Sequence, residues 1–144
     1  MIEFTVRGAP QPRGSTRAFP FRRKDGGIGV HVTDTKAASL APWMAAVREA
    51  ARRAANEKLL DGPLRVHIEF SFVRPKSVSP RKRPQHTVRP DLDKLVRAVL
   101  DACTGVVWRD DAQVVELCAR KNYGATFACR ATVAPEENDE QGTS

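Results

Sequence analysis

Apolar and polar residues alternate most regularly between Leu64 and Phe72. Every second residue of this segment is apolar, and polar residues such as His67 and Glu69 stand between them. A period of two is typical of a strand that turns one face to a core and the other to solvent. The same pattern predicts three further strands, at residues 2–6, 115–119 and 127–133.

Two other segments repeat their apolar residues at the spacing of an amphipathic helix. The first runs from about Ser39 to Leu60, and the turn-forming residues Asp61-Gly62-Pro63 are expected to end it. The second begins at Asp91, just after Pro90, and is expected to end near Thr104-Gly105.

The segment before the first helix, residues 8–35, is rich in proline, glycine and arginine. Its Gly26-Gly27 pair predicts a loose hairpin. The elements therefore follow in the order strand, hairpin, helix, strand, helix, strand, strand. This order indicates an α+β fold, a single domain in which a small mixed β-sheet packs against two main helices.

The charge of the chain is strongly positive and unevenly distributed. Its formal net charge is +7, yet residues 135–144 carry acids and no base. We expect residues 1–134 to form the domain and residues 135–144 to form a disordered tail, because the tail has no apolar side chain to bury beyond Pro135. A basic domain attracts polyanions such as nucleic acids.

The cysteines indicate a reducing compartment. Cys103, Cys118 and Cys129 are odd in number, lack CxxC spacing and each lie in an apolar pattern, which predicts buried, reduced thiols. No apolar run approaches the ~20 residues of a membrane span, and the N-terminus lacks the pattern of a signal peptide. We therefore expect a cytoplasmic protein with no membrane partner.

Residues 74–90 form the most basic segment of the chain. Prolines interrupt it, so we interpret it as a mobile loop without regular structure. Such a loop can hold DNA phosphates and steer the DNA without reading its sequence. The residues expected to bind DNA are Arg74, Lys76, Arg81, Lys82, Arg83, Arg89 and Lys94.

Acidic residues directly follow this basic loop. Asp91 and Asp93 stand at the start of the second helix, and Asp111 stands after that helix and just before a strand. If residues 104–109 lead the chain back, the three carboxylates meet at one end of the sheet. Such a cluster within a basic protein is suited to a divalent cation, and carboxylate oxygens are the hard ligands that Mg²⁺ prefers.

Structural roles for the same residues are the alternative. Asp91 can cap the helix, and Asp93, Arg97 and Asp101 can form a surface ion-pair ladder. Trp108 can serve as a packing anchor, which we favour, or as a stacking surface for a base. The three histidines show no metal-ligand spacing.

The run RPDLDKLVRAVLDA from Arg89 to Ala102, followed by Asp110-Asp111-Ala112-Gln113 and by Lys121, resembles the RusA family of Holliday junction resolvases. The family pattern combines a DxDNLxKxxxDxL helix, a DDxQV turn and a Lys at the end of the next strand. The resemblance implies a RusA-like fold and a homodimeric, Mg²⁺-dependent endodeoxyribonuclease, with Mn²⁺ as an alternative ion. It also implies symmetric nicking of four-way DNA junctions in DNA recombination and repair.

The resemblance assigns roles to individual residues. The family's catalytic, metal-binding acids correspond to Asp91, Asp93 and Asp111. Its helix Lys corresponds to Arg97, and its Asn corresponds to Lys94. Both are departures: Arg97 keeps a positive charge that can contact phosphate oxygens but cannot donate a proton as Lys can, and Lys94 replaces a neutral amide with a base.

Two other functions are compatible with these residues. One is a non-catalytic nucleic-acid binding module, in which the acids serve as caps and ion pairs. The other is a broader nuclease that cuts flaps or forks with the same site. Metal-dependent cleavage of a synthetic junction distinguishes the first from a resolvase, and a panel of branched substrates distinguishes the second.

Overall fold

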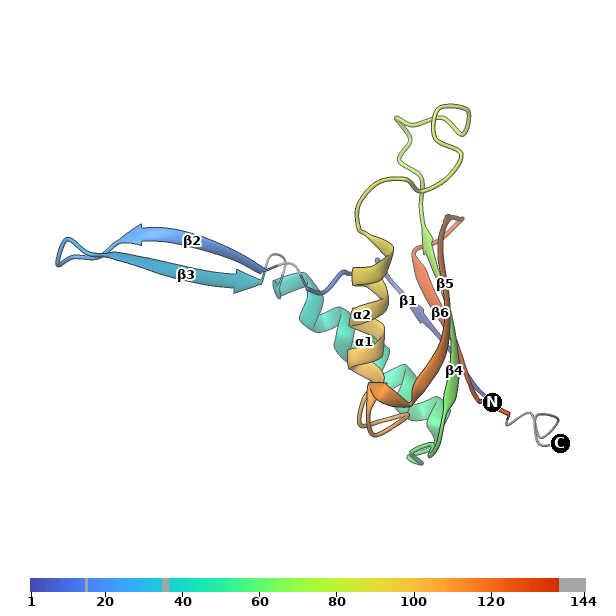
Figure 1. The fold of residues 1–144 in the computed structure, drawn as a ribbon. Helices are drawn as coiled ribbons and strands as arrows, with labels where there is room; N and C mark the ends of the chain where they lie inside the picture. Colours follow the sequence, from blue (N-terminus) through green and yellow to red (C-terminus); the bar gives the residue numbers. More distant parts are fainter. Residues whose placement is uncertain (15, 35–36, 138–144) are drawn as a thin grey trace, which may run out of the picture.

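A four-stranded sheet forms the centre of the molecule in the computed structural model, which describes residues 1–14, 16–34 and 37–137 (Figure 1). In spatial order its strands are β1 (Ile2–Arg7), β6 (Ala128–Pro135), β4 (Leu64–Phe72) and β5 (Val114–Tyr123). β4 is antiparallel to β6 and parallel to β5. The mixed sheet predicted from the sequence is therefore confirmed.

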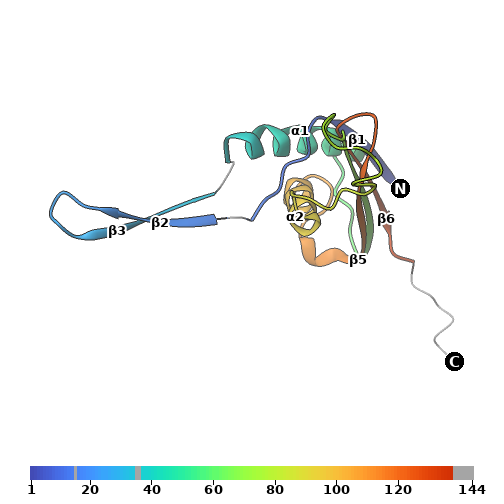
Figure 2. The ribbon, with the colours of Figure 1, turned by 90° about the horizontal axis from the view of Figure 1, so that it is seen from above.

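Two helices, α1 (Ala37–Ala55) and α2 (Leu92–Cys103), cover the same face of this sheet (Figure 2). The apolar alternation of β4 explains why: Leu64, Ile68 and Phe70 are all buried beneath the helices, whereas His67 and Glu69 face solvent on the other side. Each fully buried Leu, Ile or Phe contributes about 1.5–3 kcal/mol to folding. The core therefore lies between the sheet and the two helices.

Helix α1 ends earlier than the sequence predicted. Asn56 and Glu57 take the left-handed conformation, with φ of 52° and 60°, and this ends the helix after Ala55 rather than near Leu60. Leu60 instead donates its backbone N–H to the carbonyl of Val107 at 2.7 Å. The chain between α1 and β4 is thereby tied to the segment that follows α2.

The predicted hairpin is also confirmed. β2 (Thr16–Arg22) and β3 (Ile28–Asp34) pair in antiparallel register and form a two-stranded sheet of their own. Figures 1 and 2 show this hairpin projecting away from the sheet and helices as a long arm. Its turn is closed by hydrogen bonds between Arg23 and Gly27 and between Gly26 and Arg23.

The prediction of buried cysteines is right for two of the three. Cys103 and Cys129 are buried, and burial raises the pKa of each thiol to about 12. Cys118 is exposed, because it pairs with His67 on the solvent face of the edge strand β5. No helix among the described residues is long and apolar enough to span a membrane.

The C-terminal segment begins inside the sheet. β6 runs to Pro135, and the N–H of Glu136 donates to the Pro63 carbonyl at 2.8 Å. The Glu136 carboxylate also lies 3.4 Å from the Arg65 guanidinium. The tail predicted for residues 135–144 therefore has its first residues attached to the sheet, and residues 138–144 lie outside the described part of the chain.

Candidate active site

Two carboxylates at the start of α2 take no hydrogen bond from the part of the chain that the structure describes. Asp91 occupies the N-cap position, yet its side chain makes no capping hydrogen bond. Its nearest charged partner is Lys94, whose ammonium lies 3.7 Å away. Asp93 is exposed, and no described residue forms a hydrogen bond or ion pair with it. The positive end of the helix dipole stabilises both acids.

The alternative ion-pair ladder along α2 does not form in the part of the chain that the structure describes. Asp101 pairs with Arg13, whose Nε lies 3.2 Å from the carboxylate, rather than with Arg97. The Arg97 guanidinium instead lies against Gly14. A Cβ atom added to Gly14 would lie only 3.0 Å from Nη1 of Arg97. The backbone N–H of Arg13 also donates to the Lys94 carbonyl at 3.0 Å. Residues 13 and 14, which lead into the arm, therefore run along the exposed face of α2.

Asp111 lies at the opposite end of α2. Its Oδ1 accepts hydrogen bonds from the Trp108 indole at 3.0 Å and from the hydroxyl of Thr104, the residue that ends the helix. Within the described part of the chain, Oδ2 takes no hydrogen bond. One oxygen is thus fixed and the other is available, as is usual for a carboxylate that ligates a metal through one oxygen.

The three predicted acids do not meet within one chain. α2 spans 12 residues, which separates its two ends by ~18 Å. Accordingly, the described residues contain no group of three or more His, Cys, Asp or Glu side chains that could hold a metal ion. The expectation that Asp111 joins Asp91 and Asp93 at one end of the sheet is wrong for a single chain. Figure 1 shows the loop before α2 and the turn before β5 at opposite ends of that helix.

The other residues of the Asp110–Gln113 motif hold the turn together. Asp110 caps the short helix η1 (Asp111–Gln113) by accepting from the Ala112 N–H at 2.9 Å. The Gln113 amide donates to the carbonyls of Leu60 at 2.9 Å and Gly62 at 3.0 Å. Gln113 thereby fixes the turn to the segment before β4, and Asp111 is the acid of the pair that hydrogen-bonds to the end of α2.

Trp108 is the packing anchor that the sequence favoured. Its side chain is 0% exposed, which excludes stacking on a DNA base. Its indole N–H also lies 3.2 Å from the Thr104 hydroxyl. Trp108 therefore positions Asp111 from within the core.

The basic loop between β4 and α2 is irregular, as predicted, but it is anchored to β5. The Arg74 guanidinium stacks on the Tyr123 ring at 4.4 Å and donates to the carbonyls of Arg83 at 3.3 Å and Pro84 at 3.2 Å. Arg74 and Arg83 are therefore half-buried residues that shape the loop. The cations that remain exposed to solvent are Lys76, Arg81, Lys82 and Arg89.

Two residues of this region have roles that the sequence did not indicate. The Lys121 ammonium donates to the carbonyls of Val88 at 2.7 Å and Pro90 at 2.8 Å, directly before Asp91. His86 is 7% exposed and stacks on Phe72 with 4.2 Å between ring centroids. Burial, and the positive charge of Lys121, lower the pKa of His86. Both side chains line a cavity of about 430 Å³ beside the start of α2.

Comparison with known proteins identifies the family. The family model described as "Endodeoxyribonuclease RusA" matches residues 9–134. The chain belongs to the RusA family of endodeoxyribonucleases. It is also 32% identical over 132 residues to the uncharacterized protein YqaN of Bacillus subtilis (strain 168), a match that covers 85% of this chain and 87% of YqaN.

Membership of the RusA family establishes the general activity. The chain is an endodeoxyribonuclease of the Holliday junction resolvase type, and members of this family bind branched DNA and depend on a divalent metal. The match includes both ends of α2 and therefore all three of the acids described above. It also includes the anchored basic loop and the β2–β3 arm.

Proposed function

We propose that this RusA-family protein is a Mg²⁺-dependent Holliday junction resolvase that cuts four-way DNA junctions symmetrically during recombination and repair. The observation that carries the proposal is the pair of carboxylates at the start of α2. Asp91 occupies a capping position without capping, and Asp93 has no partner among the described residues. Apart from the helix dipole and the ion pair with Lys94, the described residues give these acids no structural role, whereas a metal site adjoining a basic loop uses both.

The donor chemistry of the acids suits Mg²⁺. Asp91, Asp93 and Asp111 would hold the ion, because carboxylate oxygens are its preferred protein ligands. Trp108 and Thr104 would orient Asp111 through Oδ1 and leave Oδ2 for the ion. The chemistry supplied by a bound Mg²⁺ is polarisation of the scissile phosphate and activation of the attacking water.

A homodimer resolves the separation of the acids. When two copies of α2 pack antiparallel about a two-fold axis, Asp91 and Asp93 of one copy come to the end that carries Asp111 of the other. The edge strand β5 supports packing beside α2, because its apolar residue Leu117 is 46% exposed. Leu117 pairs with the buried Val66 and therefore shares the sheet face that carries the helices.

The two-fold axis also fits the substrate. An isologous dimer has two equivalent sites, and a four-way junction must be cut on two strands. Arg97, on the exposed face of α2, would contact the non-bridging phosphate oxygens as they gain charge. The exposed cations Lys76, Arg81, Lys82 and Arg89, with the half-buried Lys94, would bind the flanking phosphates.

Mixed dimers test the proposal. Asp93→Asn and Asp111→Asn should each reduce cleavage of a synthetic junction in Mg²⁺ by about 10²–10³-fold as homodimers. When the two variants are co-expressed with different tags and the mixed dimer is purified, one of its sites carries both substitutions and the other carries neither. The mixed dimer should therefore nick one strand of the junction at close to the normal rate per intact site.

The matched control is the mixed dimer of Asp91→Asn with Asp93→Asn. Both substitutions lie at the same end of α2, so both of its sites are defective and no activity should return. A shared site is excluded if the Asp93→Asn and Asp111→Asn dimer is as inactive as this control. A panel of junction, fork, flap and duplex substrates should show cleavage of the junction first, and equal cleavage of flaps would favour the broader nuclease.

A further inference from the structure

The β2–β3 arm lacks the support that a β-hairpin normally needs. Its two strands pair only with each other within the described chain, and the arm stands clear of the core (Figure 2). A two-stranded hairpin is marginally stable in water unless a third strand, a helix or another partner covers it. The seven-residue strands make the arm ~23 Å long. An element of this length and exposure is suited to contact something outside the chain.

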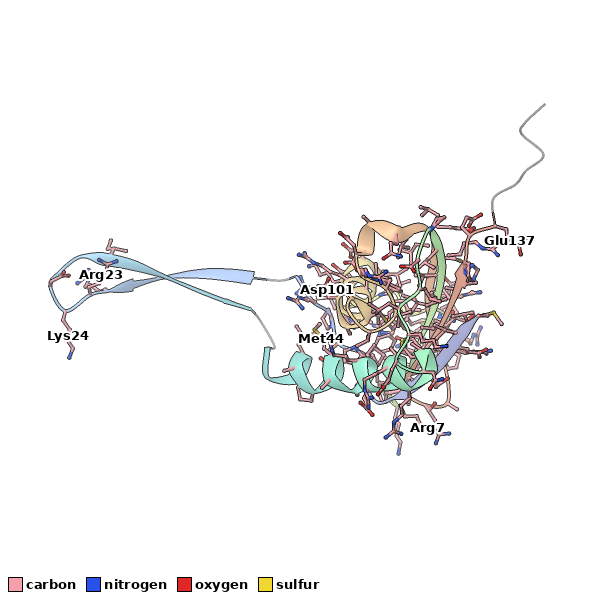
Figure 3. All side chains as sticks on the ribbon, turned by 90° about the horizontal axis from the view of Figure 1, so that it is seen from below. Arg7, Arg23, Lys24, Met44, Asp101 and Glu137 are labelled. Carbon is pink, nitrogen blue, oxygen red and sulfur yellow. The ribbon has the colours of Figure 1, made fainter. Side chains whose placement is uncertain are left out.

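The far end of the arm is basic. Arg22, Arg23 and Lys24 are consecutive, and every residue from Arg22 to Ile28 is exposed. The one acid of the tip, Asp25, accepts the N–H of Gly27 at 2.9 Å and so belongs to the turn. Figure 3 shows Arg23 and Lys24 at the end of the arm that is farthest from the helices.

The base of the arm adjoins the candidate active site. Gly14, which precedes β2, lies against the Arg97 guanidinium, and Arg13 pairs with Asp101 of α2 at 3.2 Å. A strand of DNA whose phosphate lies at Arg97 therefore passes the point from which the arm projects. The tip can then reach phosphates that the cleavage site itself cannot reach.

We infer that the β2–β3 arm is a second DNA-binding element, whose tip residues Arg22, Arg23 and Lys24 bind backbone phosphates of the junction away from the cut. The inference rests on the proposed nuclease function and adds a contact surface to it. A two-stranded ribbon fits the major groove of DNA, and a basic tip is attracted to phosphate. A second copy of this chain is the weaker candidate, because DNA offers the three cations a dense row of phosphates and a protein surface of net charge +7 does not.

The test replaces Arg22, Arg23 and Lys24 together by Gln. Binding to a four-way junction is measured without metal, over a range of salt concentrations. The tip variant should bind the junction at least ~10-fold more weakly near physiological salt, and the slope of log K against log salt should fall by about 2–3. Single-turnover cleavage in Mg²⁺ at saturating protein should stay within about twofold of the original, because the tip does not touch the reacting phosphate.

A matched control removes the same charge elsewhere. Arg52, Arg53 and Lys58, at and just beyond the C-terminal end of α1, are exposed, and their replacement by Gln should leave the salt slope within one unit of the original. Equal binding by the tip variant and the unchanged protein overturns the inference. A shift of the tip variant from dimer to monomer in sedimentation also overturns it, since the arm then binds a second copy. A wild-type protein that leaves junctions uncut in Mg²⁺ refutes the proposed function instead.

Discussion

Replacing Lys121 by Met should separate the placement of the proposed catalytic acids from the binding of DNA. The Lys121 ammonium donates to the carbonyls of Val88 and Pro90 at 2.7 and 2.8 Å, and Pro90 directly precedes Asp91. Met keeps the apolar stem of the side chain but removes both hydrogen bonds. The last residues of the basic loop then lose their attachment to β5.

The magnitude follows from those two hydrogen bonds. A hydrogen bond to a charged group contributes about 1.5–3 kcal/mol, and the lower end applies here because Lys121 is only half-buried. Loss of both bonds should therefore lower the free energy of unfolding by up to about 3 kcal/mol. A displacement of Asp91 by roughly 1 Å is enough to slow cleavage by about 10²-fold.

The assay compares single-turnover cleavage in Mg²⁺ with junction binding in its absence. Lys121→Met should slow cleavage about 10²-fold and weaken binding only a few-fold. Lys121→Arg should restore much of the rate, because a guanidinium can donate to both carbonyls. Arg120→Met is the control, since Arg120 is the exposed neighbour on the same strand and carries the same charge. If Lys121→Met weakens binding as much as cleavage, Lys121 contacts phosphate and does not position Asp91.

Two further predictions concern stability. Asp111→Asn should lower the free energy of unfolding of the metal-free protein by about 1 kcal/mol, because a neutral amide accepts the Trp108 and Thr104 hydrogen bonds more weakly than a carboxylate. Asp93→Asn should lower it by only about 0.3 kcal/mol, the loss of an exposed charge at the positive end of the helix dipole, and thermal unfolding measures both. Burial lowers the pKa of His86 below its ordinary 6.5, so His86 takes up a proton more readily in the unfolded chain than in the folded one. The contribution of His86 to the free energy of unfolding should therefore be complete above pH 6.5 and should be lost as the pH falls below 6.5. Urea unfolding at pH 7.5 and 5 should show this loss, and His86→Phe, which keeps the stacking on Phe72, should reduce it.

The strands and α2 could be predicted because their hydrophobic periods are long and uninterrupted. β4 alternates from Leu64 to Phe72, and its buried residues are the apolar ones of that alternation. The end of α1 could not be predicted from the Asp61-Gly62-Pro63 turn signal. The left-handed residues Asn56 and Glu57 end the helix, and neither residue type requires that conformation.

The basic loop was predicted by composition but not by its contacts. Charge alone suggested that all its arginines face DNA. Arg74 instead stacks on Tyr123, a residue 49 positions further along the chain, and Lys121 reaches back to Val88. Such contacts depend on how β5 is placed beside β4, and the spacing of charges along the sequence carries no information about that placement.

The arrangement of the acids follows from topology. β4 and β5 are parallel, so the chain must return along the sheet between them, and α2 makes that return. The start of α2 therefore lies at the end of β4, and the turn before β5 lies at the opposite end of the sheet. Asp91 belongs to the first position and Asp111 to the second, so one chain with this topology cannot bring them together. A parallel β–α–β crossover therefore favours a site shared by two chains for acids at these two positions.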